Sequence, residues 1–185
     1  MARKFKILTI ISVLFFLIFF TWHLISPADA LFTACITFGV CSYHFLMRLA
    51  VGGIVDAIFH NHMNYRKRHF QPRKFEPRLY AVLRVEKWNK HVPTYSPDTF
   101  SVKKHSWEEI AMATCQAEIV HEVIVVLSFL PILLSIPFGT SLVFATTSLC
   151  AALVDTYFVI IQRYNRPRIL ALMARIAQRR ARHNQ

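Results

Sequence analysis

Four long apolar runs constrain the fold of this chain more than any other feature of its sequence. They cover residues 7–25, 31–59, 116–136 and 141–161. An α-helix rises about 1.5 Å per residue, so roughly 20 apolar residues cross the hydrocarbon core of a bilayer. We therefore expect an all-α integral membrane protein with four transmembrane helices, plus amphipathic helices on the cytoplasmic side.

The first apolar run raises the question of a cleavable signal peptide, because Ala28-Asp29-Ala30 resembles a small-x-small cleavage site. Its 19 residues, 7–25, exceed a typical signal-peptide core and are enough to span a membrane. We favour an uncleaved helix, which pairs with the second run in an N-terminal segment, 1–60.

The distribution of basic residues predicts how the helices are oriented. The chain has 22 Lys and Arg residues and a formal net charge of +12. All but Arg48 lie before residue 7, within 60–108 or after residue 161, and the connections 26–30 and 137–140 contain none. Because cytoplasmic loops are enriched in Lys and Arg, both termini are expected to be cytoplasmic. The same argument assigns the basic and aromatic stretch 62–91 to the lipid headgroup interface, and nucleic acid is not expected as a partner.

Two polar segments predict helices at the membrane surface. Within the basic segment 61–108, residues 78–92 have apolar side chains at helical spacing, and the prolines around them predict fixed turns. In the segment 162–185, apolar and arginine side chains lie on opposite helical faces. We predict a separate tail helix here, with Pro167 in its first turn; a cap of this helix is the structural alternative to a functional role for Asn165.

Ionisable residues inside the apolar runs mark the candidate site, because such groups are costly in a membrane and usually face a cavity or a partner. Most lie in the predicted hairpin 109–161. The set comprises His44, Arg48 and Asp56 of the second run, Glu118, His121 and Glu122 of the third, and Asp155 of the fourth. Helical spacing and equal distances from the 137–140 turn predict one cluster near the cytoplasmic side. Arg48 is the only cation that we expect to be available to its carboxylates.

Two interpretations of the third run stay open. In the chemical one, His121 is a general base, and Glu118 or Glu122 orients its ring. In the structural one, these side chains join helices by hydrogen bonds. A metal is not expected, because Glu-x-x-His is half of a di-iron helix pair and the chain has no second copy. The four cysteines lie in apolar runs without CxxC spacing, so we interpret them as small buried residues.

Three sequence segments resemble a known family. They are 162–168 (QRYNRPR), 117–121 (AEIVH) and 86–93 (EKWNKHVP). Together they are similar to the glycosyl-4,4'-diaponeurosporenoate acyltransferase family, bacterial membrane enzymes that esterify a glycosylated carotenoid with a fatty acyl group. The matching positions are Trp88, Glu118, His121, Gln162, Arg163, Asn165, Arg166 and Arg168.

The resemblance implies an acyltransferase in the bacterial cell membrane, with acyl-CoA as a co-substrate and no other cofactor. We expect Arg163, Arg166 and Arg168 to bind the phosphates of coenzyme A, although arginines here could also hold lipid phosphates. His121 and Glu118, with Glu122, form the predicted catalytic set. The remaining matching residues and the polar residues of the second and fourth runs form the predicted substrate-binding set.

The leading hypothesis is therefore acyl transfer from a thioester to a sugar hydroxyl of a glycosylated carotenoid or another lipid-linked acceptor. One alternative is a non-enzymatic, lipid-binding or accessory membrane protein. Another is a proton-coupled transporter with Asp56, Glu122 and Asp155 as its relay. The sequence leaves the oligomeric state open.

Overall fold

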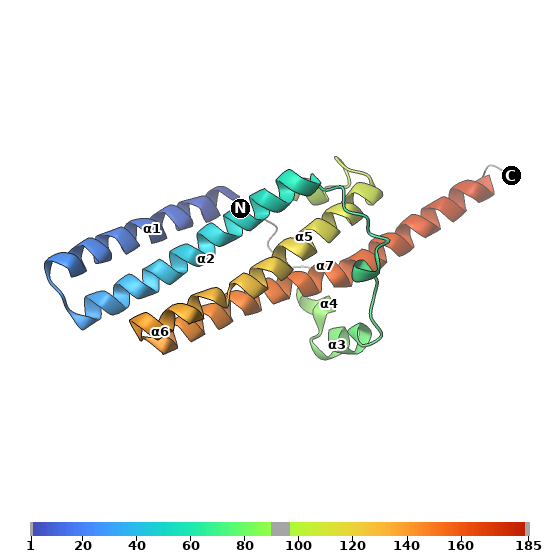
Figure 1. Ribbon diagram of the computed structural model, residues 1–185. Helices are drawn as coiled ribbons and strands as arrows, with labels where there is room; N and C mark the ends of the chain where they lie inside the picture. The colour runs from blue at the N-terminus through green and yellow to red at the C-terminus, as the bar shows by residue number, and fades with distance from the viewer. Residues whose placement is uncertain (1, 90–96, 184–185) are drawn as a thin grey trace. The chain divides into compact units, whose positions relative to one another are not determined.

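A computed structural model describes residues 2–89 and 97–183, and all regular structure in these ranges is helical (Figure 1). The α-helices are α1 (Ala2–Ile25), α2 (Asp29–Phe59), α3 (Glu76–Val82), α4 (Val85–Trp88), α5 (Trp107–Leu127), α6 (Ser135–Phe138) and α7 (Ser141–His183). Short 3-10 helices are η1 (Arg68–Phe70), η3 (Pro97–Phe100) and η4 (Leu130–Leu134).

Four helical stretches are long and apolar enough to cross a membrane. They are Ala2–Ile25, Asp29–Phe59, Trp107–Phe138 and Ser141–His183. The predicted all-α class is therefore confirmed for the described residues, and each apolar run lies in a helical stretch with the length and composition to span a membrane. The amphipathic helices on the cytoplasmic side stay a prediction. The cytoplasmic location of the termini stays a prediction.

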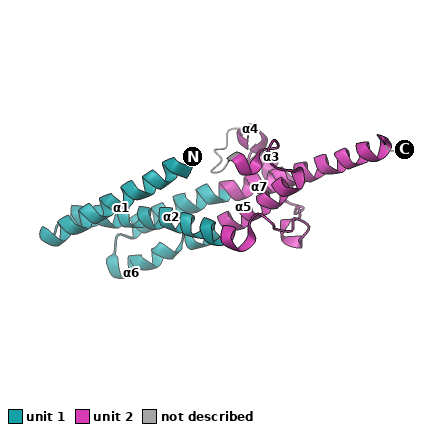
Figure 2. Cartoon of the chain, turned by 90° about the horizontal axis from the view of Figure 1, so that it is seen from above, with its two compact units in different colours: residues 1–54, 122–156 teal, residues 55–121, 157–185 magenta. Residues whose placement is uncertain are grey.

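The chain divides into two compact units (Figure 2). Unit 1 consists of residues 1–54 and 122–156, and unit 2 of residues 55–121 and 157–185. The helices α2, α5 and α7 each contribute one part to unit 1 and one part to unit 2.

Within unit 1, α1 and α2 pack closely through small residues. The hydroxyl groups of Ser12 and Ser42 are hydrogen-bonded at 3.0 Å. A Cβ atom at Gly39 would lie 3.2 Å from the ring of Phe16. Because lipid offers no hydrophobic drive for helix association, such close backbone approach is a usual source of stability. Gly39 thus fixes the distance between the two helices.

The hairpin between the third and fourth apolar runs turns where the sequence predicts. The helix α6 ends at Phe138 and α7 begins at Ser141, and Gly139 and Thr140 between them have φ angles of +66° and +48°. The third helix is less regular than expected. The α5 helix ends at Leu127, and the 3-10 helix η4 follows because Pro131 has no backbone N–H for an α-helical hydrogen bond.

The predicted boundary between the fourth transmembrane helix and a separate tail helix is wrong. A single helix of 43 residues, α7, runs through Pro167. Proline keeps a helical φ angle but removes one hydrogen bond, so the surrounding contacts must hold the helix together. Arg163 and Arg166, just before the proline, supply such contacts within unit 2. Asn165 lies inside this helix, which excludes the structural alternative of a cap.

The predicted helix over residues 78–92 is divided in two. The helix α3 ends at Val82, α4 begins at Val85, and Arg84 between them adopts the left-handed conformation with a φ angle of +51°. This turn breaks the predicted apolar face, because Val85 is completely buried whereas Val82 is 79% exposed. Residues 90–92 lie outside the described residues. Attachment of this segment to the bilayer stays a prediction.

Candidate functional site

A buried carboxylate lies at the centre of unit 2. Glu118 on α5 has no solvent-exposed surface. Arg163 on α7 donates from Nη1 to Oε1 of Glu118 at 2.5 Å, and Arg166, three residues later, donates from Nη2 to Oε2. Two guanidinium groups thus occupy both oxygens of one carboxylate.

Arg163 also binds a second carboxylate. Its Nε lies 2.8 Å and its Nη2 2.6 Å from Oε1 of Glu76, the first residue of α3. Its remaining N–H groups donate to the carbonyl oxygens of His69 and Gln71, each at 3.1 Å. Arg163 therefore joins α3, α5, α7 and the segment before α3.

Arg166 is the most deeply placed cation in this network. It is 1% exposed, and its guanidinium lies 5.0 Å from the centre of the Phe70 ring. It donates to Thr114 Oγ1 at 3.0 Å, to the Thr114 carbonyl at 3.1 Å and to the Phe70 carbonyl at 3.2 Å. The two arginines and the two carboxylates, Glu76 and Glu118, balance in charge. We call these four residues the buried charge network.

The expectation that Arg48 is the only cation available to the carboxylates is wrong. Arg163 and Arg166 neutralise Glu118, and one turn of α7 brings both to the same carboxylate. Arg48 pairs with one carboxylate of the predicted set, Asp155, within unit 1. It also donates to the carbonyl oxygens of His44 at 3.0 Å and Ala151 at 3.2 Å.

The predicted polar cluster is distributed over both units. His44, Arg48, Glu122 and Asp155 belong to unit 1, whereas Asp56, Glu118 and His121 belong to unit 2. Both ring nitrogens of His44 are buried without a hydrogen-bond partner among the described residues. Asp56 is exposed and accepts a hydrogen bond from Gln116 Nε2 at 3.0 Å.

His121 is half-buried in unit 2 and stacks on Phe158, with ring centroids 4.7 Å apart and an interplanar angle of 15°. Stacking covers one face of the imidazole, whereas the two ring nitrogens lie at the edge of the ring. The Glu118 oxygens are bound by arginines, which favours a structural role for Glu118 over the orientation of His121. The catalytic role of His121 stays a prediction.

The other residues of the family resemblance lie around the network. Trp88 stacks on Tyr157 at 4.5 Å and donates from Nε1 to the Leu83 carbonyl at 2.8 Å. Asn165 forms two side-chain hydrogen bonds with Asn89, both of 2.9 Å. Those not yet placed are Gln162, half-buried on α7, and Arg168, whose guanidinium lies 3.6 Å from the centre of the Tyr164 ring.

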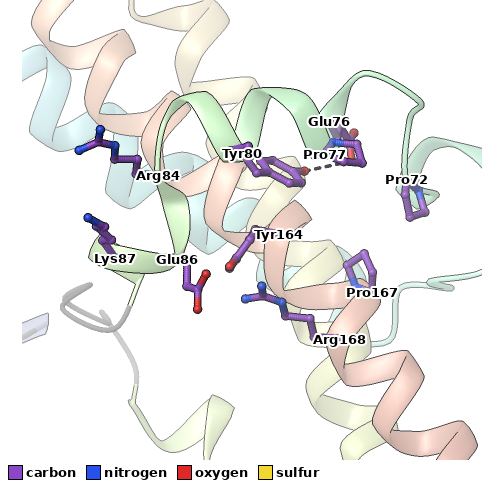
Figure 3. Close-up of a pocket in the computed structure, with 11 residues that line it drawn as sticks. Pro72, Glu76, Pro77, Tyr80, Arg84, Glu86, Lys87, Tyr164, Pro167 and Arg168 are labelled. Atoms are coloured by element: carbon purple, nitrogen blue, oxygen red, sulfur yellow. Dashed lines mark hydrogen bonds between the residues drawn. The ribbon is translucent and has the colours of Figure 1, made fainter.

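An open groove of about 530 Å³ lies next to the buried charge network (Figure 3). It is lined by Pro72, Glu76, Pro77, Tyr80, Ala81, Arg84, Glu86, Lys87, Tyr164, Pro167 and Arg168. The site residues predicted from the sequence do not include Glu76, Tyr80 or Arg84. The Glu76-Pro77 pair is a helix-start signal, but nothing local indicates that Glu76 pairs with an arginine 87 residues away.

These features define an all-helical protein with four helices that can span a membrane, and with a buried charge network in one of its two units. The model of the family described as glycosyl-4,4'-diaponeurosporenoate acyltransferase matches residues 65–175. This range is more than half of the chain and contains the network and the groove. The chain belongs to this family, as the resemblance predicted. No curated protein and no solved structure matches the chain.

Proposed function

We propose that the protein is an acyltransferase of the bacterial cell membrane, with both termini cytoplasmic. It moves a fatty acyl group from acyl-CoA to a sugar hydroxyl of a glycosylated carotenoid or another lipid-linked acceptor. The observation that carries this proposal is the family match over residues 65–175, because this range includes the candidate base His121 and all four residues of the buried charge network.

In the proposed reaction, the hydroxyl oxygen attacks the thioester carbonyl carbon, an ester bond forms, and the carbon–sulfur bond breaks. His121 accepts the hydroxyl proton and passes it to the departing thiolate, so that an ester and a thiol result. The sequence places no serine or cysteine in a recognisable nucleophile motif, which favours direct transfer over an acyl-enzyme. Glu122 adjoins His121 on α5 and belongs to the proposed catalytic set.

The buried charge network has a positioning role in this proposal. Its four residues connect α3, α5 and α7, and α5 carries His121 one turn after Glu118. Pairs of guanidinium and carboxylate groups with additional backbone acceptors are geometrically specific. They support a fixed position for His121 on α5.

The test is comparative lipid mass spectrometry of cells that express the wild type or His121→Asn at equal protein levels. His62→Asn, at an exposed position of the same unit, is the matched control. We expect a glycolipid to gain a fatty-acyl mass with the wild type and His62→Asn, but not with His121→Asn. If no lipid gains an acyl group with the wild type, in a host that supplies glycosylated lipids and acyl-CoA, the proposal is wrong.

A non-enzymatic accessory function is the second candidate. The observation that favours it is that Glu118 is fully occupied by Arg163 and Arg166, as a structural role requires. In that case His121→Asn should change a lipid phenotype only in proportion to the amount of folded protein. An acylated product that disappears at unchanged protein level excludes this candidate.

A further inference from the structure

The groove in unit 2 has a surplus of positive charge. Arg84, Lys87 and Arg168 line it with exposed side chains, and Glu86 is the exposed carboxylate among its lining residues. Glu76 also lines the groove, but it is buried and paired with Arg163. Three cations therefore face one unburied anion, and the groove suits a ligand with more than one negative charge.

The buried charge network leaves a different set of cations for ligand binding than the sequence suggested. Arg163 and Arg166 donate to Glu76 and Glu118, so their charges are already compensated. Arg168 instead lies over the ring of Tyr164. A guanidinium group stacked on an aromatic ring keeps its in-plane N–H groups for a planar or tetrahedral anion.

The backbone of the segment between α3 and α4 brings further cations to the groove. Arg84 adopts a left-handed conformation, with φ +51° and ψ +43°, that is unfavourable for a residue with a Cβ atom. Such conformations are concentrated at binding sites, where the surroundings maintain them. Here the turn ends α3, and both Arg84 and Lys87 line the groove.

The centre of the groove is aromatic. In Figure 3, Tyr80 and Tyr164 lie between Arg84 and Lys87 on one side and Arg168 and Pro167 on the other. The two tyrosine rings meet edge to face with centroids 5.3 Å apart. The Tyr80 hydroxyl donates to Glu76 Oε2 at 3.0 Å, so this ring is held in place. An aromatic centre flanked by cations is a suitable surface for a phosphorylated head group.

We propose that this groove binds a phosphate-bearing head group through Arg84, Lys87 and Arg168. The source that the proposed function requires, and on which this step rests, is the coenzyme A part of the acyl donor, with its pyrophosphate and 3′-phosphate. The other source of the same chemistry is the headgroup of an anionic lipid. In either case the phosphates are bound by the groove and not by Arg163 and Arg166.

The experiment measures coenzyme A binding to the full chain in phosphatidylcholine nanodiscs by calorimetry. Arg84→Gln and Arg168→Gln remove single charges from the groove, whereas Arg175→Gln is the matched control, an exposed arginine two turns further along α7. We expect each groove variant to weaken binding about tenfold, as the loss of a charge-assisted contact predicts, and the control to leave it unchanged. Glu86→Gln should tighten binding, because it removes the exposed anion.

A second arm distinguishes the two phosphate sources. Nanodiscs with phosphatidylglycerol replace those of phosphatidylcholine, and native mass spectrometry counts the lipid retained by each variant. Loss of phosphatidylglycerol in Arg84→Gln and Arg168→Gln, with no coenzyme A binding to the wild type, assigns the groove to a lipid headgroup and overturns the donor assignment. If the groove variants change neither ligand relative to Arg175→Gln, the groove is not a phosphate site.

The phosphate-binding proposal and the acyl-transfer proposal can fail independently of each other. If cells form no acylated lipid but the groove variants still weaken coenzyme A binding, the phosphate site stands and the acyl transfer does not. If acylation occurs and Arg84→Gln and Arg168→Gln leave the KM for the acyl thioester unchanged, the acyl transfer stands and the groove assignment is wrong.

Discussion

Replacement of Glu118 by glutamine should strongly destabilise unit 2. The change keeps the size of the side chain and removes its charge, so the guanidinium groups of Arg163 and Arg166 lose a shared carboxylate. Arg166 is 1% exposed, so water cannot compensate the charge of its guanidinium group. Removal of one partner from a buried ion pair leaves an uncompensated charge, and this effect dominates the loss.

The magnitude follows from the contacts that remain. Arg163 keeps the carboxylate of Glu76, and Arg166 keeps three neutral acceptors, two on Thr114 and the Phe70 carbonyl. The loss should therefore equal that of one broken buried pair, about 3–5 kcal/mol, and not that of two. For a chain of this length, that corresponds to a decrease in Tm of roughly 6–20 °C.

The assay is thermal unfolding of the purified protein in nanodiscs, followed by circular dichroism. Glu108→Gln is the matched control, because Glu108 is an exposed carboxylate of the same helix whose Oε1 accepts a hydrogen bond from Tyr65 at 3.2 Å. We expect that variant to lie within about 0.5 kcal/mol of the wild type. The double variant Glu118→Leu/Arg166→Met should recover part of the loss, because it removes both charges. A decrease in Tm of less than about 3 °C for Glu118→Gln would refute the reasoning.

Three further predictions concern other parts of the chain. Burial, followed by the hydrogen bond to Glu76, raises the pKa of Tyr80 above its ordinary value. The folded state thus favours the protonated phenol of Tyr80. This stabilisation is complete below pH about 10 and is lost as the pH rises through the raised pKa. The Tm should therefore fall more steeply with alkaline pH in the wild type than in Tyr80→Phe. Gly39→Val should destabilise the protein by about 1–3 kcal/mol through its contact with Phe16, whereas Gly52→Val, with no atom within 4 Å of the added Cβ, is the near-neutral control in the same unfolding assay. Arg84→Gly should leave the Tm unchanged or raise it by up to about 4 °C, because glycine adopts the left-handed conformation without strain. The same variant should still weaken coenzyme A binding. A lower Tm contradicts the strain argument.

The membrane-spanning part of the fold was predictable because its cause is visible in the sequence. In lipid, a long apolar run satisfies its backbone hydrogen bonds by forming a helix. The Pro-Phe-Gly-Thr segment before Ser141 is an evident turn. The errors occur where distant contacts override a local signal. Pro167 is a signal for a helix start, yet the arginines before it are held by α3 and α5, and the helix continues.

The candidate site was predictable only in part, for the same reason. The sequence assigns Arg48 and Asp155 to one polar cluster, and the structure shows that they pair. The partners of Glu118 do not follow, because the family resemblance and the charge of Arg163 and Arg166 assigned both arginines to the phosphates of coenzyme A. Glu76 was not predicted at all, because the sequence of the basic segment around it does not indicate which of its side chains face α7.

The geometry of the QRYNRPR motif shows what its three arginines can do. At about 100° per residue, Arg166 lies roughly 60° from Arg163 around α7, so both face the same carboxylate, whereas Arg168 lies about 140° from Arg163. The structure agrees with this division: the first two arginines pair with Glu118, and Arg168 stacks on Tyr164 at the groove. One short motif therefore contributes two cations to a neutral, buried network and one to an open, basic surface. A single substitution in it should affect stability at positions 163 and 166 and ligand binding at position 168, and this difference separates the positioning role of the network from the binding role proposed for the groove.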